Sequence, residues 1–166
     1  MRTIPLGLLA VLAAGVACSS SASSTPANVA GTYTVSVTNG QNGCMVGTFT
    51  PGSMTAGVTV QVTQNGAQVS ADVMGLAGVY LTAGVGSSTL VGSLDGSTAS
   101  LSANANHTMG MCAYTTTASA SITWSGDTMQ GTITYTDSGN GSSDCGVVQS
   151  CTNQQNFAGS RPPQSG

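Results

Sequence analysis

The chain has 166 residues, of which only 4% are charged, and its formal net charge is −3. It contains no Lys and no Glu, so its charged side chains are two Arg and five Asp. Nucleic-acid binding needs clustered Lys and Arg that displace counterions, and attraction to anionic lipid headgroups needs the same residues. The composition therefore argues against nucleic acid as a partner and against electrostatic docking to a membrane.

Residues 1–17 predict an export signal. The stretch starts with a cation at Arg2, continues with an apolar run too short to span a membrane, and ends in small residues. Ordinary secretion, with cleavage after Ala17, is one interpretation. Removal of this segment leaves Arg161 as the one Lys or Arg of the mature chain, against five carboxylates.

The tetrapeptide Gly15-Val16-Ala17-Cys18 resembles the lipobox of bacterial lipoproteins, and it precedes a Ser-rich stretch of the kind that those proteins carry. The resemblance implies that Cys18 becomes the mature N-terminus and carries acyl chains. Such chains anchor a protein almost permanently, because each buried methylene adds about 0.8 kcal/mol. Ser19 at the next position implies sorting to the outer membrane. Residues 18–28 are then the lipidated Cys and a flexible tether.

The other cysteines predict two disulfides. The chain has five cysteines, and assigning Cys18 to lipid leaves an even number in an oxidising compartment. Four cysteines allow three pairings. Cys145 and Cys151 enclose a short loop and are the expected local pair, which leaves Cys44 to pair with Cys112. Metal binding by these four is the alternative, but their spacings match no zinc pattern.

Alternation of Val, Ile, Leu and Tyr with Thr and Ser predicts short strands along the mature chain. Dipeptides that favour tight turns separate many of them, among them Asn65-Gly66, Asp95-Gly96 and Gly126-Asp127. The segment 104–110 is expected to be looser, and no segment has the periodicity of a helix. The expected strands are 29–38, 44–50, 58–62, 69–73, 76–83, 90–94, 99–103, a long strand that ends at Trp124, 128–137 and 155–159.

Many short strands joined by tight turns predict an all-β, antiparallel up-and-down meander of about eight to ten strands. We expect it to close into a barrel, with a β-sandwich as the alternative, in one domain at 29–161 followed by a disordered tail at 162–166. With ten strands, the first and last run in opposite directions and can pair. The same count places Cys44, Cys112 and the loop 145–151 at one rim, and the tethered N-terminus at the other.

The opening Val29-Ala30-Gly31-Thr32-Tyr33-Thr34 and the repeated hairpins resemble small β-rich lipoproteins of environmental bacteria. At a greater distance they resemble lipocalin-type barrels, which open with a Gly-x-aromatic strand, although the helix of that family is not expected here. The resemblance implies the barrel shape and no particular ligand. Small residues expected to point inward, such as Ala71, Gly92 and Gly131, fill a wide barrel incompletely and would leave room for a small apolar ligand.

The sequence predicts no enzyme and no cofactor, because catalysis needs convergent titratable groups and the chain has one His, five Asp and neither Lys nor Glu. One cluster could hold a metal: His107, Met109 and Met111 precede Cys112, and thioethers with an imidazole suit Cu(I). The favoured interpretation is that Met45 and Met111 pack under a disulfide while His107 is solvated, since Met commonly fills gaps.

These features predict an exported, lipid-anchored and non-enzymatic β-barrel at the outer membrane that acts as a structural or binding module. A lipocalin-like carrier of a small apolar ligand is the alternative function. A membrane-spanning barrel is a third interpretation, and the seven aromatic residues argue against it because they cannot form two girdles.

Overall fold

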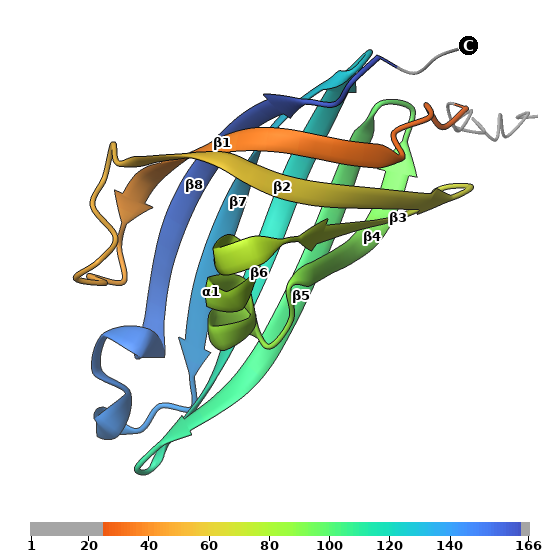
Figure 1. Ribbon diagram of the computed structural model, residues 1–166. Helices are drawn as coiled ribbons and strands as arrows, with labels where there is room; N and C mark the ends of the chain where they lie inside the picture. Colours follow the sequence, from red (N-terminus) through yellow and green to blue (C-terminus); the bar gives the residue numbers. More distant parts are fainter. Residues whose placement is uncertain (1–24, 164–166) are drawn as a thin grey trace, which may run out of the picture.

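Eight strands surround the core in residues 25–163, the part of the chain that this computed structural model describes. They follow one another around a closed antiparallel barrel in sequence order, and β1 pairs with β8 to complete it (Figure 1). The expected all-β meander that closes into a barrel is therefore confirmed. In chain order the elements are β1 Gly31–Asn42, β2 Met54–Asn65, β3 Gln68–Val73, α1 Gly75–Val85, β4 Thr89–Asp95, β5 Thr98–Met109, β6 Cys112–Ser125, β7 Thr128–Gly139, the 3-10 helix η1 Ser143–Gln149 and β8 Ser150–Ser160.

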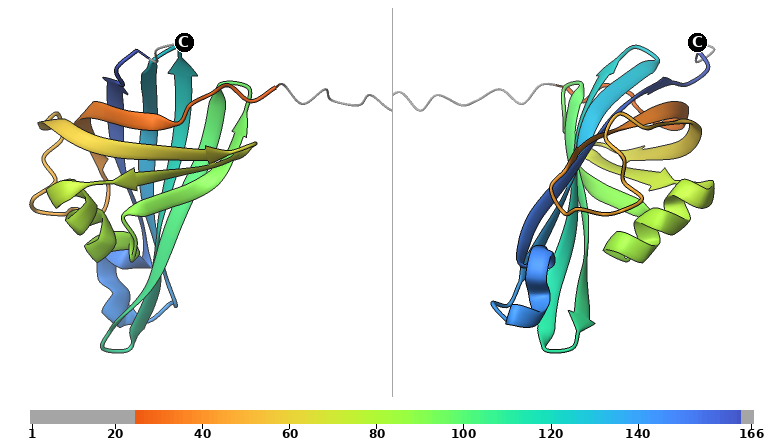
Figure 2. Two further views of the ribbon diagram at one scale, coloured as in Figure 1. Left: turned by 45° about the vertical axis from the view of Figure 1, so that its right-hand side comes forward. Right: turned by 90° about the vertical axis from the view of Figure 1, so that its left-hand side faces the viewer.

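The alternation in the sequence determines which side of each strand faces the core. In β6 every second side chain from Ala118 to Trp124 is buried, and the Ser and Thr residues between them are exposed. Successive side chains of a strand point to opposite faces, so this pattern gives an apolar interior and a hydroxyl-rich exterior. Strands β5 to β8 are longer than β3 and β4 and extend past them on one side of the barrel (Figure 2).

The strand expected at 44–50 is wrong, because this segment is a loop between β1 and β2. Asn42 controls it: its side-chain amide donates to the carbonyls of Val46 and Phe49, and its side-chain oxygen accepts from the Val46 amide. Asn side chains bond readily to nearby backbone in this way, and those bonds compete with strand pairing. Met45 has a φ of 54°, which is also incompatible with an extended strand.

The strand expected at 76–83 is also wrong, because this segment lies in helix α1. Its run of apolar residues carries no clear period, so the pattern does not distinguish a strand from a helix here. Helical spacing instead buries Gly78, Leu81 and Val85 against the barrel. Gly86 ends the helix with a φ of 74°, and its amide donates to the carbonyl of Thr82.

The loss of two expected strands leaves an even number, so the first and last strands still run antiparallel and the barrel still closes. The segment 104–110 was expected to be loose, whereas β5 continues to Met109 and pairs with β6 along its whole length. The expectation that small inward residues leave empty space is not met at Gly131: a Cβ there would lie 2.7 Å from Cζ of Phe157. The Phe157 ring occupies that position.

Candidate functional site

The barrel has two ends of different construction. Connections at one end are short, and we call this the turn end; those at the other carry a long loop and both helices, and we call it the loop end. The turn end comprises the turns 66–67, 96–97 and 126–127, the strap 25–30 and Arg161. The loop end comprises the loop 43–53, α1 with its flanking residues, the turn 110–111 and the segment 140–149, together with the strand residues that adjoin these connections, such as Met54 and Met109.

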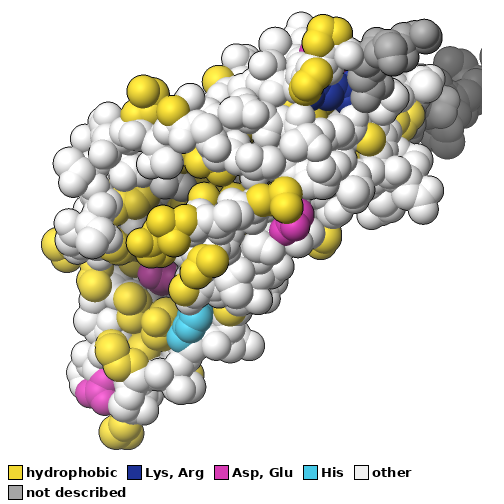
Figure 3. Space-filling view, in the orientation of Figure 1, with side chains coloured by type: hydrophobic (Ala, Val, Ile, Leu, Met, Phe, Trp, Pro, Cys, Tyr) yellow, Lys and Arg dark blue, Asp and Glu magenta, His cyan; other side chains and the backbone are white. Residues whose placement is uncertain are grey.

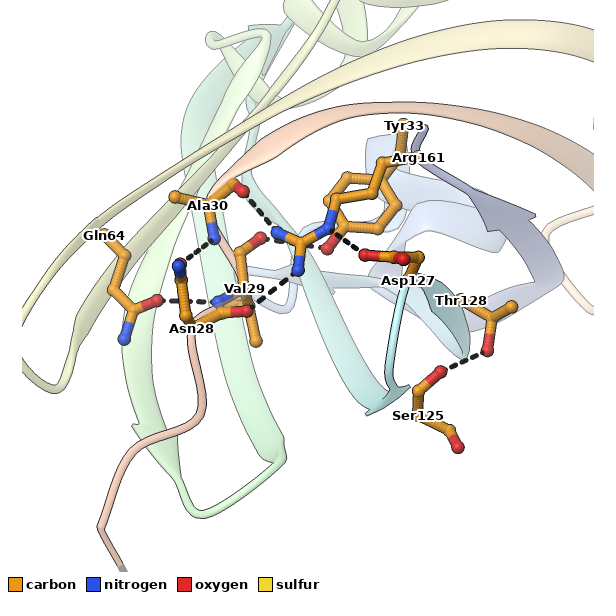
Figure 4. Close-up of polar contacts among 9 residues, drawn as sticks. All are labelled: Asn28, Val29, Ala30, Tyr33, Gln64, Ser125, Asp127, Thr128 and Arg161. Carbon is orange, nitrogen blue, oxygen red and sulfur yellow. Dashed lines mark hydrogen bonds and ion pairs between the residues drawn. The ribbon is translucent and has the colours of Figure 1, made fainter. Parts of the chain in front are cut away.

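Arg161 organises the turn end (Figure 4). Its Nε donates to Oδ1 of Asp127 at 3.0 Å, and its terminal nitrogens donate to the carbonyls of Asn28 and Ala30. Its guanidinium lies 5.5 Å from the centroid of the Tyr33 ring, within cation–π range. The residue is only 8% exposed, so its charge is neutralised by Asp127 and solvated by backbone carbonyls in place of water. Burial raises the pKa of Tyr33, and the Arg161 charge opposes part of that rise.

Further hydrogen bonds fix the strap 25–30 to the turn end. The amide of Ala27 donates to the carbonyl of Gly96 at 2.8 Å. The side chain of Gln64 accepts from the amide of Val29 and donates to the carbonyl of Ala27. The N-terminal part of the described chain therefore joins the barrel at the turn end, as the strand count predicted.

Two disulfides brace the loop end, and both expected pairings are wrong. Neither Cys44–Cys112 nor Cys145–Cys151 forms; the structure joins Cys44 to Cys151 and Cys112 to Cys145. The error follows from the extra strand at 44–50. Without it, Cys44 lies just past the end of β1, beside β8, which starts at Ser150. The expectation that all four cysteines share one rim is confirmed.

A polar layer points inward beneath the disulfides. The hydroxyl of Tyr135 donates to Gln155, whose amide donates to Asn39 at 2.8 Å. Thr116 donates to Oδ1 of Asp137 at 2.5 Å. Burial raises the pKa of Tyr135 to about 12. These groups use one another as hydrogen-bond partners within the layer.

One grouping has the spacing of a metal site. The ligand atoms of Cys44, Asp137 and Cys151 lie within 4.8 Å of one another. The two sulfurs are joined in a disulfide, however, and metal coordination by Cys requires a thiolate. The 3.3 Å approach of Cys151 Sγ to Asp137 is a contact and not a hydrogen bond, because a disulfide sulfur carries no proton. The bridged form thus offers no thiolate ligand here.

The copper candidates lie in two environments. His107 stacks on Tyr114 with ring centroids 5.0 Å apart, and its Nε2 is 2.9 Å from the carbonyl of Gly84 near the end of α1. Met109 and Met111 are 54% and 79% exposed. The expectation that Met45 and Met111 pack under a disulfide is wrong, since Met45 is also 74% exposed. Through its contacts with Tyr114 and with the carbonyl of Gly84, His107 helps to hold α1 against β5.

Exposed apolar side chains concentrate at the loop end. Of the eleven large hydrophobic residues that are exposed in the described chain, ten belong to this end, and only Val91 on β4 does not. Half of the ten are Met. Figure 3 shows hydrophobic side chains gathered over α1, the neighbouring loop and the tip of the β5–β6 hairpin. The ten are Met45, Val46, Met54, Met74, Leu76, Val79, Tyr80, Met109, Met111 and Val147.

Helix α1 accounts for three of these side chains. Its sequence, GLAGVYLTAGV, has hydroxyls only at Tyr80 and Thr82 and no charge, so the helix is largely apolar on all sides. Leu76, Val79 and Tyr80 are 62% to 70% exposed. A surface helix normally places polar residues on its outer face. The outer face of α1 therefore has the apolar composition that is typical of a buried helix face.

An open groove of about 580 Å³ runs between α1 and the end of β3. Gly78 and Val79 line its apolar side, and Asp72 and Ser88 line the other. Oδ1 of Asp72 accepts hydrogen bonds from Ser88 at 2.7 Å and Thr89 at 3.0 Å. Asp72 lies on the outer face of β3 and forms a half-buried acidic wall of this groove.

A second open groove, of about 430 Å³, lies on the outer face of β5 to β8. Its lining is mainly Ser and Thr, together with Leu101, Ala120 and Gln154, and it contains no charged residue. Both grooves lie outside the barrel wall, whereas the sequence placed a ligand space inside it.

Cys18 lies outside the described residues. No helix within residues 25–163 has the length and apolar character needed to cross a membrane. No protein-family model, curated protein or solved structure matches the chain.

Sequence reasoning did not single out α1 or Arg161 as features of the two ends. A signal for each was present. Gly75 precedes the apolar run 76–83, and Gly86 follows it closely. A Gly just past the C-terminal side of such a run often marks the end of a helix. Arg161 is the one Lys or Arg within residues 25–163, and a lone cation among Asp residues is the signal that could have singled it out.

Proposed function

We propose that this chain is an exported, lipid-anchored and non-enzymatic β-barrel, held at the outer membrane through Cys18, that acts as a binding module through its loop end. The observation that carries the proposal is the opposition of the two ends. The described chain joins the barrel at the turn end, and ten of eleven exposed large hydrophobic residues belong to the loop end.

Export is supported by the leader and by the two disulfides, which persist in oxidising compartments. The lipobox-like tetrapeptide ending at Cys18 and Ser19 after it support anchoring at the outer membrane. Because the strap 25–30 is fixed at the turn end, an anchor that precedes it would hold the turn end toward the bilayer. The loop end would then be directed away from it.

A non-enzymatic role is supported by where the titratable groups lie. Asp127 neutralises Arg161 at the turn end. At the loop end Asp137 accepts from Thr116, Asp144 accepts from the amide of Met111, and His107 contacts α1. Each has a structural partner, and acid–base or nucleophilic catalysis requires such groups to converge on one reacting position.

The test is the mass and location of the mature protein in its own host. Processing at Cys18 adds a diacylglycerol-sized mass, places the protein in outer-membrane fractions and partitions it into detergent. The Cys18→Ala variant should lose the added mass and become water-soluble, while a Ser19→Ala variant should keep the mass. A water-soluble wild-type protein that begins at residue 18 without added mass would contradict the anchor.

A carrier of a small apolar ligand is the second candidate, and the closed barrel with an apolar interior is the observation that favours it. Native mass spectrometry of protein purified from its host separates the two functions. A retained apolar molecule supports the carrier. An empty protein whose interior excludes a solvatochromic dye supports the module.

A further inference from the structure

The groove beside α1 combines an apolar surface with a negative charge. Val79 and the small residue Gly78 supply the apolar side. On the facing wall, both hydrogen bonds to Asp72 reach Oδ1, so Oδ2 accepts none within the described part of the chain. An ionised carboxylate can accept more bonds than the two that Oδ1 receives here. The geometry thus leaves a charged acceptor facing an apolar wall.

Within residues 25–163 no Lys or Arg neutralises that carboxylate. Arg161 is the one Lys or Arg in residues 25–163, and it is buried against Asp127 at the opposite end. We propose that the groove beside α1, with the exposed apolar side chains around it, binds an amphipathic segment of another protein that carries Lys or Arg. The proposal rests on the proposed function in taking the loop end as the binding end.

The chemistry of the surface selects this partner. An amphipathic helix or strand would lay its apolar side chains on Val79 and Tyr80 and place a cation on Oδ2 of Asp72. The five exposed Met residues suit such a partner, because thioether side chains adapt to differently shaped apolar surfaces. A second copy of this chain cannot supply the cation, since its one mature Arg is already buried and paired.

A membrane surface fits this end less well than a protein does. The charged groups of the loop end and the groove are all carboxylates, namely Asp72, Asp137 and Asp144, and anionic lipids repel them. The strap 25–30 also joins the barrel at the other end.

The probe is a helical peptide of Leu and Lys with all Leu on one face, and a second peptide has Glu in place of every Lys. Fluorescence anisotropy measures their affinity for the exported full chain carrying Cys18→Ala, which needs no detergent whether or not the natural chain is lipidated. The Leu/Lys peptide should bind at least about tenfold more tightly than the Leu/Glu peptide.

Asp72→Asn should weaken binding of the Leu/Lys peptide about fivefold to tenfold, because it removes a charge-assisted bond. Val79→Ser combined with Tyr80→Ser should weaken it by more than about tenfold through lost apolar contact. Two matched controls lie outside the loop end, Asp95→Asn in a tight turn and Val91→Ser on β4. Each should change the affinity by less than about twofold.

Equal binding of the two peptides, or binding that Asp72→Asn leaves unchanged, would overturn the choice of partner. Stronger association with phosphatidylcholine vesicles than with the peptide, lost in Val79→Ser with Tyr80→Ser, would assign the surface to lipid instead. Loss of binding in the Val91→Ser control would show that the effect is not local. None of these results depends on the mass of the mature protein, so the anchor and the groove can fail separately.

Discussion

The turn end and the loop end of this barrel are closed by different chemistry. At the turn end one buried cation, Arg161, joins the strap 25–30, the turn at Asp127 and the last strand through charge-assisted hydrogen bonds. At the loop end two disulfides hold long connections, and large apolar side chains remain in solvent. The difference is that the turn end is closed around a buried ion pair, whereas the loop end is braced by disulfides and keeps large apolar side chains exposed.

The largest expected effect comes from removing the loop-end bridges. Cys44 and Cys151 are 107 residues apart, and Cys112 and Cys145 are 33 apart. Loop-closure entropy predicts that replacing the first pair by Ala lowers the free energy of unfolding by about 5 kcal/mol, and the second by about 4. Urea unfolding followed by fluorescence of Trp124 measures both. Peptide mapping without reduction is the control, and fragments joining Cys145 to Cys151 would contradict the pairing.

Replacing Arg161 at the turn end should lower the free energy of unfolding by somewhat less than removing a disulfide does. Arg161→Met removes the partner of Asp127 and leaves the carbonyls of Asn28 and Ala30 without their donor. We expect the free energy of unfolding to fall by about 3 kcal/mol. Arg161→Lys should recover only part of it, because an ammonium cannot reproduce the planar fork. If both variants were as stable as the wild type in urea, this end would not be closed by Arg161.

The polar layer at the loop end should make stability depend on alkaline pH. Burial raises the pKa of Tyr135 to about 12 in the folded chain, against about 10 in the unfolded chain. The folded state therefore holds this proton more tightly. The stabilisation is complete below about pH 10 and is lost as the pH rises toward about 12, by about 2 to 3 kcal/mol.

Tyr135→Phe should flatten that fall, and the slope of unfolding free energy against pH is the quantity to compare. A smaller fall should persist in the variant, because burial also raises the pKa of Tyr33. A wild-type slope equal to that of Tyr135→Phe would show that Tyr135 is solvated in the folded protein.

The substitutions with the smallest expected effect on the free energy of unfolding test most sharply whether the loop end serves stability or binding. Val79→Ser and Tyr80→Ser remove side chains that are 62% and 70% exposed, so each should change the free energy of unfolding by less than about 0.5 kcal/mol. Leu81→Ala on the same helix should cost about 2 to 4 kcal/mol, because Leu81 is buried against the barrel. A large loss from Val79→Ser would mean that the outer face of α1 serves stability instead of binding.

The sequence was sufficient for the barrel itself. Alternation is strong where one strand face meets the core and the other meets water, as in β6, and Asn65-Gly66 and Asp95-Gly96 mark turns with positive φ at Gly. It was insufficient at 76–83, where all residues except Thr82 are apolar and the apolar positions show no clear period. It failed again at 44–50, where side-chain bonds from Asn42 replace strand pairing.

The candidate surface was less predictable because it depends on which loops meet in space. The methionines near Cys44 and Cys112 drew attention in the sequence, but their exposure appears only after the barrel closes. The alternation of β3 places Asp72 on the outer face of that strand and says nothing more about it. Its role as a groove wall depends on α1, which the sequence did not predict. The cysteine partners changed for the same reason, since one false strand moved Cys44 away from β8.

The central claim is that the turn end faces the anchoring membrane and the loop end faces away from it. The most direct measurement places a small fluorophore at Ser97 in a turn or at Thr48 in the long loop, by unnatural amino-acid incorporation, in the lipidated protein reconstituted in vesicles whose headgroups carry a quencher. Both residues are exposed. We predict strong quenching at Ser97 and little at Thr48. Equal quenching at the two positions, or stronger quenching at Thr48, would contradict the account.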